Sequence, residues 1–141
     1  MALIESLDHL VLTVADPEAS VRFYCGILGC REIISNNGRR AFAFGHQKIN
    51  LHVKGHEIDP HAKAPVCGSA DLCFLTSTPI EKIIRILGEC GVNPELGPVP
   101  REGAREPLRS VYCRDPDGNL IEISNPVRTC PKATDTKARR L

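Results

Sequence analysis

The sequence predicts an α+β protein made of two βαβββ modules, and the prediction depends on features that occur twice. An apolar, β-favouring run begins near His9, and another begins near Asp71, 62 positions later. The same spacing relates the residues that bracket a helical pattern after each run: Pro17 and Pro79, Gly29 and Gly91. Two half-chains with the same order of elements predict two copies of one structural unit.

The first module is predicted to contain four strands and one helix. Residues 7–14 are rich in leucine and β-branched residues, which is typical of a strand. Asp16 as the N-cap and Pro17 at the first helical position predict a helix start, and Gly29 ends the apolar helical pattern that follows. Three shorter strands are predicted at residues 32–35, 40–44 and 49–53, the first two joined by an Asn-Gly hairpin turn.

The second module repeats this order. A strand is predicted at residues 71–76, and Thr78 and Glu81 have the spacing of a capping box at the start of a helix that ends at Gly91. Later strands are predicted at residues 110–114 and 120–124, on either side of an Asp-Pro-Asp-Gly turn. His52 and Glu122 are 70 positions apart, so an insertion of eight residues is predicted in a loop at 97–107.

We expect a single domain over residues 1–127. Module one covers 4–54, a linker covers 55–68 and module two covers 69–127, while the polar, basic tail at 128–141 is predicted to be disordered. Each module has one amphipathic helix and a sheet with one face left uncovered. Two modules, from one chain or from two, must therefore enclose that second face.

Composition excludes several classes of function. The formal net charge of the 141 residues is +1, which favours neither nucleic acid nor a membrane surface as a partner. No apolar run approaches the ~20 residues of a membrane span, and the N-terminus lacks the pattern of a secretion signal. The seven cysteines are odd in number and form no C-x-x-C pair. Reduced, buried thiols in a cytoplasmic protein are the expectation.

Side-chain alternation predicts where chemistry would occur. Within their strands His9, His52 and Glu122 lie opposite the strongly apolar face, so they should line the uncovered side of the sheets. Two imidazoles and a carboxylate suit a divalent metal ion, and Zn, Ni, Fe, Mn and Co all remain open. The alternative is that each is a satisfied polar group on an exposed face. For Asp71, a cap at the start of a strand is a further alternative.

Three segments resemble the vicinal oxygen chelate superfamily, which includes glyoxalase I, extradiol dioxygenases and fosfomycin-resistance proteins. They are Leu-Asp-His-Leu-Val-Leu-Thr-Val at 7–14, Phe-Tyr-Cys-Gly-Ile-Leu-Gly at 23–29 and Asp-Pro-Asp-Gly-Asn-Leu-Ile-Glu-Ile at 115–123. Residues 44–52 and 97–101 are most similar to a branch of glyoxalase domain-containing proteins. The resemblance implies an open, cup-shaped barrel of mixed β-sheet around a metal, with the helices outside.

The resemblance also implies a ligand set, from which this chain departs. Metal ligands in the family come from the first and last strands of the modules, which corresponds to His9, His52 and Glu122, with Asp71 at the fourth position. Bacterial-type glyoxalases have His, Glu, His, Glu in strand order, whereas this chain has His, His, Asp, Glu. Extradiol dioxygenases have His where this chain has Asp71.

The leading hypothesis is a metal-dependent, glyoxalase I-like lyase or isomerase. It would act on a small substrate with adjacent oxygens by Lewis-acid stabilisation of an enediolate. Glu122 or Asp71 would move the proton, and Tyr112 and the loop arginines would bind substrate: Arg101, Arg105 and Arg109.

Two other functions remain open. An Fe(II) ring-cleaving dioxygenase of the extradiol type would use His9, His52 and Glu122 as its metal triad. A non-catalytic module that binds or sequesters a small ligand is the second alternative. We expect a homodimer, in which His9 and His52 face Asp71 and Glu122 of the partner.

Overall fold

The computed structural model describes residues 1–128, so the predicted disordered tail lies, from residue 129 onward, outside the described part. The first module consists of β1 (His9–Val14), α1 (Pro17–Val21), a wider helical stretch η1 (Arg22–Ile27), β2 (Arg31–Ile34), β3 (Arg40–Phe44) and β4 (Gln47–Val53). The second consists of β5 (Asp71–Leu75), α2 (Ile80–Glu89), β6 (Leu96–Glu102), β7 (Pro107–Arg114) and β8 (Leu120–Pro126). No helix within residues 1–128 is long and apolar enough to cross a membrane.

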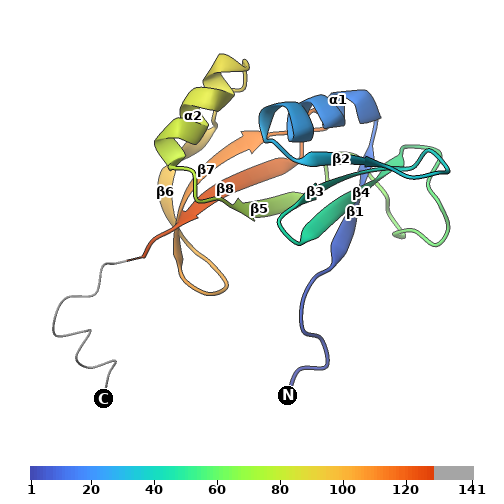
Figure 1. Ribbon diagram of the computed structural model, residues 1–141, viewed down its shortest axis with the longest axis horizontal. Coiled ribbons are helices and arrows are strands. Elements are labelled where there is room, and N and C mark those ends of the chain that lie inside the picture. Colours follow the sequence, from blue (N-terminus) through green and yellow to red (C-terminus); the bar gives the residue numbers. More distant parts are fainter. Residues whose placement is uncertain (129–141) are drawn as a thin grey trace.

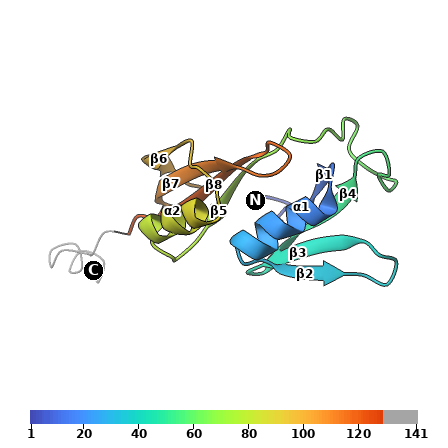
Figure 2. The same ribbon diagram turned by 90° about the horizontal axis from the view of Figure 1, so that it is seen from above.

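Each module forms its own four-stranded mixed sheet. Sheet A has the order β1-β4-β3-β2 and sheet B the order β5-β8-β7-β6. The first strand of each pairs in parallel with the last, and the remaining pairs are antiparallel. The helices cover one side of both sheets and leave the other side open (Figure 1), and the modules lie side by side (Figure 2). The predicted α+β fold is therefore confirmed, with two sheets that stay separate within one chain.

The predicted alternation is present in the strands beside the helices. Leu12 and Val14 of β1 are buried, and so are Ile121 and Ile123 of β8. Tyr24 of η1 is fully buried and stacks on Phe42 of β3, with ring centroids 4.3 Å apart. Because apolar residues alternate toward the helices, the polar residues between them lie on the open faces.

The capping box predicted for the second helix is wrong. Its N-cap is Pro79, and no side chain of the helix's own first turn caps it. Instead Asn125 of β8 accepts a hydrogen bond from the Ile80 amide at 2.8 Å and donates to the carbonyls of Thr76 and Thr78. A tertiary contact thus satisfies the backbone groups that a local Thr–Glu pair was expected to satisfy.

The predicted insertion loop is largely a strand. Residues 96–102 form β6, the edge strand of sheet B, and only residues 103–106 turn toward β7. Pro98 and Pro100 are tolerated because an edge strand leaves half of its amides unpaired. Gly97 has φ +120°, and a Cβ at this residue would lie 2.5 Å from the Ser110 carbonyl oxygen. This position therefore requires glycine.

The strand register corrects the predicted match between His52 and Glu122. In sheet A Asn50 is paired with Val11, whereas His52 is paired with Thr13. In sheet B Glu122 is paired with Cys73, the residue 62 positions after Val11. Asn50 is thus the counterpart of Glu122, and His52 lies two residues further along the same strand face.

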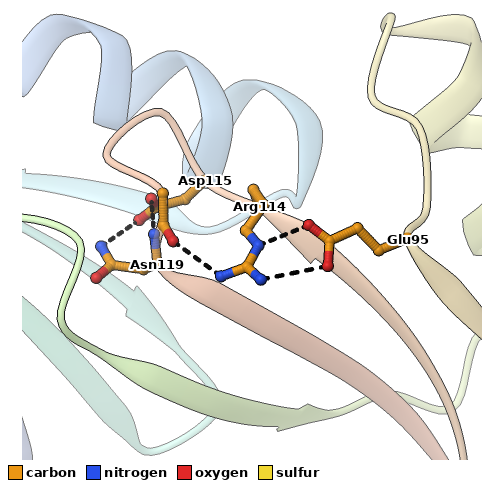
Figure 3. Close-up of polar contacts among 5 residues, drawn as sticks. Glu95, Arg114, Asp115 and Asn119 are labelled. Carbon is orange, nitrogen blue, oxygen red and sulfur yellow. Dashed lines mark hydrogen bonds and ion pairs between the residues drawn. The ribbon is translucent and has the colours of Figure 1, made fainter.

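The Asp-Pro-Asp-Gly-Asn turn joins the two modules. The Tyr24 hydroxyl donates to Asp115 Oδ2 at 2.6 Å, and Asp115 also accepts from the side-chain and backbone N–H groups of Asn119 (Figure 3). The Ala15 amide donates to Asp117 Oδ1 at 3.0 Å. A loop of module two is therefore bonded to the first strand–helix unit of module one.

The six cysteines within the described residues are free. Cys113 is buried as expected, and burial raises the pKa of its thiol to about 11. Cys73 and Cys90 are exposed, contrary to the prediction: Cys73 lies on the open face of β5, and Cys90 is the C-cap residue after α2. Cys130 lies outside the described part.

Candidate metal and substrate site

The open face of sheet A carries His9, Asn50 and His52. Nδ1 of His9 lies 2.7 Å from Asp8 Oδ2. Because a carboxylate can only accept, Nδ1 is the donor in this contact, and Nε2 is the ring nitrogen left for a metal. His52 is half-buried and lines a pocket of about 290 Å³ together with linker residues: Pro60, His61, Ala62 and Pro65.

The open face of sheet B holds Glu122 in a fixed position. Ser110 Oγ donates to Glu122 Oε2 at 2.7 Å, and Ser124 Oγ lies 3.3 Å from the same oxygen. The two hydroxyls are 2.6 Å apart and both serines are fully buried. Cys73 Sγ extends this chain of contacts to Ser124 at 3.3 Å. With Oε2 held by the serines, Oε1 is the oxygen available to a ligand.

Arg101 and Tyr112 lie beside Glu122 on the same face. Tyr112 is directly opposite Glu122 in the β7–β8 pair. Arg101 Nε donates to the Tyr112 hydroxyl at 2.8 Å, and the guanidinium carbon lies 5.3 Å from the centre of the ring. Burial, opposed by Arg101 and reinforced by Glu122, raises the pKa of Tyr112. The phenol therefore stays protonated at neutral pH.

Asp71 begins β5 and is exposed. It is paired with Leu120, which is paired in turn with Arg114, so the three lie in one row across sheet B. Arg114 Nε donates to Glu95 Oε1 at 2.7 Å (Figure 3), and this bond holds the pKa of the Glu95 carboxyl below its usual value. Arg114, the cation in this row, is thus paired with Glu95, and Asp71 has no ion pair among residues 1–128.

The other two arginines of the predicted loop lie elsewhere. Arg109 points to the helix side of sheet B, where it pairs with Glu81 of α2, so its predicted role at the substrate is wrong. Arg105 lies in the turn between β6 and β7, beyond the end of the sheet face that carries Glu122. Of these residues, Arg101 is the one that shares a face with Glu122.

The candidate ligands of one chain do not come together. Within the described residues, no three His, Cys, Asp or Glu side chains form a group that could hold a metal ion. His9 and His52 are four residues apart along a parallel strand pair, or ~13 Å along the strands. Two imidazoles on one ion need ring nitrogens about 3.3 Å apart. The donor types nevertheless fit a divalent ion, because His9 presents a free Nε2 and Glu122 a free Oε1.

One mainly apolar pocket lies away from these residues. A pocket of about 310 Å³ lies on the helix side, between the end of η1 and α2, and is lined mainly by aliphatic and aromatic side chains. Lys82 and Cys30 are the only titratable groups in its lining. This cavity lacks the acid–base groups that the open faces carry.

Comparison with known families decides the evolutionary group. Residues 6–123 match the model of the Glyoxalase/Bleomycin resistance protein/Dioxygenase superfamily. The chain belongs to this superfamily. The predicted resemblance to vicinal oxygen chelate proteins is thereby confirmed, and the matched segment contains all four candidate ligands: His9, His52, Asp71 and Glu122.

Relatives within the superfamily include proteins named without a reaction. Virulence protein STM3117 of Salmonella typhimurium is 49% identical over 122 residues, which cover 86% of this chain and 85% of that protein. Its crystal structure superposes with a TM-score of 0.86 over 89% of this chain and 100% of that one. Glyoxalase domain-containing protein RDO1 of Mycosarcoma maydis is 47% identical over 86% of this chain and 69% of its own length.

More distant structures share the fold alone. Lactoylglutathione lyase of Agrobacterium tumefaciens has 19% sequence identity and a TM-score of 0.68, over 88% of this chain and 96% of that one. An enzyme of known name therefore uses the same arrangement of modules.

Proposed function

We propose that this protein is a metal-dependent, glyoxalase-like enzyme whose site is completed by a second copy of the chain. The observation that supports it best is the division of the candidate ligands between two open sheet faces. Sheet A carries His9 with Nε2 free, and sheet B carries Glu122 with one oxygen fixed by buried serines. Facing sheet A of one chain with sheet B of another covers both faces and gathers the ligands.

The register favours His9, Glu122 and Asp71 as the ligands of a divalent ion. His9 and Asp71 occupy equivalent positions, and Glu122 is two residues, or ~7 Å, along the face from Asp71. His52 is further along sheet A and beside the linker, so we assign it to the substrate side of the site. Zn, Ni, Fe, Mn and Co all suit this donor set.

A bound ion would act as a Lewis acid toward two adjacent substrate oxygens. The chain's own part is to move a proton. In the free protein Glu122 Oε1 would hold the ion. When the substrate oxygens take its place beside the ion, the same oxygen would take the hydrogen from the carbon that bears one oxygen and return it to the neighbouring carbon, so the net change is an isomerisation that needs no oxidant. Ser110 and Ser124 keep the carboxylate in place through both transfers. The ring-cleaving alternative requires two imidazoles on one ion, which the register does not favour.

The proposal is tested by metal content and isomerase turnover. We expect near-stoichiometric divalent metal in the purified protein, lost in His9→Ala, Asp71→Asn and Glu122→Gln but kept in His52→Ala and in a control at an exposed turn, His46→Ala. Turnover is assayed with glutathione hemithioacetals after loading with Zn, Ni, Co or Mn. Absence of turnover with all four metals refutes the reaction, and a protein that binds no metal favours the ligand-sequestering alternative.

Subunit mixing tests the shared site. His9→Ala and Glu122→Gln each inactivate both sites of a homodimer. When equal amounts of the two variants exchange subunits fully, half of the dimers contain one chain of each variant. One of the two sites in such a dimer has both His9 and Glu122. About a quarter of the natural activity should therefore return. If the two residues act within one chain, mixing restores nothing.

A further inference from the structure

Arg101 is fixed in place but not neutralised. Its side chain donates to the Tyr112 hydroxyl and to the Pro100 carbonyl at 2.8 and 2.9 Å, and both acceptors are uncharged. Within residues 1–128 it has no carboxylate within 4.0 Å. Five arginines of this part of the chain have such a partner: Arg40, Arg85, Arg109, Arg114 and Arg128. Among the arginines without one, Arg101 is the one that shares a sheet face with Glu122.

The position of Arg101 connects it to the proposed site. Tyr112 lies between Arg101 and Glu122, and adjacent strands are ~4.8 Å apart. A substrate whose reacting oxygens are near Glu122 therefore reaches the guanidinium with its opposite end if it is only a few carbon atoms long. The proton-transfer group of β8 and the phenol of β7 are paired across the sheet, and Arg101, whose backbone is paired with Leu108, reaches that phenol with its side chain.

We propose that Arg101 and Tyr112 form a carboxylate-recognition subsite, so that the substrate is a small acid with its adjacent oxygens at one end and its carboxylate at the other. This inference rests on the proposed function for the adjacent oxygens. A guanidinium binds a carboxylate with two parallel N–H donors from two different nitrogens. Nε and one Nη1 hydrogen of Arg101 are engaged, so one Nη1 hydrogen and both Nη2 hydrogens are left for a carboxylate. Because Tyr112 already orients the side chain, little rotamer entropy is lost on binding.

Three related compounds test this subsite by binding to the Zn-loaded protein in calorimetry. 3,4-Dihydroxybenzoate has adjacent oxygens opposite a carboxylate, 3,4-dihydroxybenzamide is its uncharged counterpart, and catechol lacks the substituent. We expect the acid to bind about 10- to 100-fold more tightly than the amide. Arg101→Gln should abolish this preference while the affinity for the amide stays the same, and Arg101→Lys should restore only part of it.

Arg85→Gln is the matched control, because it removes the same charge from the helix side of the chain. It should leave the preference for the acid unchanged. If Zn-dependent binding is seen but the acid and the amide bind with equal affinity, the carboxylate subsite is refuted while the metal site stands. The same holds if Arg85→Gln and Arg101→Gln lose the preference for the acid equally. If none of the three compounds shows Zn-dependent binding, the proposed chelating site fails, and this inference fails with it.

Discussion

Removing the Tyr24 hydroxyl should destabilise the protein by about 2 kcal/mol. This hydroxyl is buried and donates to the Asp115 carboxylate at 2.6 Å. A hydrogen bond to a charged group contributes about 1.5–3 kcal/mol. Asp115 keeps its bonds from Asn119 in the Tyr24→Phe variant, which places the loss in the lower part of that range. For a chain of this size the melting temperature should fall by about 5–8 °C.

The other tyrosine in the sequence provides the matched control. Tyr112→Phe also removes one hydroxyl that is bonded to a charged group, but on an open sheet face. It should change the free energy of unfolding by no more than about 0.5 kcal/mol. Urea unfolding at pH 7 measures the free energy of unfolding of both variants, and we expect both to keep the m-value of the natural protein. Equal losses in both variants would mean that the Tyr24–Asp115 contact does not hold the modules together.

Three further outcomes are expected. Ser110→Ala should weaken metal binding about 10- to 100-fold by releasing Glu122, whereas Ser20→Ala, an equally buried serine in α1, should not; equal affinities would exclude a positioning role. Gly97→Ala should cost about 2 kcal/mol or more in urea unfolding, because φ +120° and the Ser110 carbonyl leave no room for a Cβ. The pKa of Glu81 is lowered first by a hydrogen bond from its own backbone amide and then by Arg109. The stability difference between natural protein and Glu81→Gln should therefore be present at neutral pH and disappear as the pH falls through that lowered pKa. A difference that does not change as the pH is lowered contradicts this.

Local patterns were sufficient for the elements whose stability is local. Asp16 accepts a hydrogen bond from the Glu18 amide and Pro17 begins α1, as predicted. Gly29 and Gly91 have positive φ after their helices because glycine adopts that conformation without strain. The alternation in β1 and β8 also indicated which residues would lie on the open faces. In each case the residues close by in the sequence determine the local conformation.

Long-range contacts explain the errors. Asn125 caps α2 from 45 positions away, so the local Thr78–Glu81 spacing was misleading. The pairing of Val99 with Ser110 makes β6 a strand, although two prolines and a glycine favour a loop when read alone. The match of His52 to Glu122 required the same 70-residue spacing between the two modules before and after the turn of each hairpin. Register depends on the lengths of the β3–β4 and β7–β8 turns, which differ between the modules.

The charges of the open faces bear on how two chains would pair. The outward rows of sheet A carry Arg31, Lys48 and His9, whose Nδ1 contacts Asp8. Those of sheet B carry the carboxylates Asp71 and Glu122 together with Arg101 and Arg114. Facing two copies of sheet B would bring carboxylates together in an enclosed space, where like charges repel strongly. In the proposed dimer, facing sheet A with sheet B would instead place an imidazole and a lysine opposite the carboxylates. We therefore expect the proposed dimer to pair sheet A of one chain with sheet B of the other.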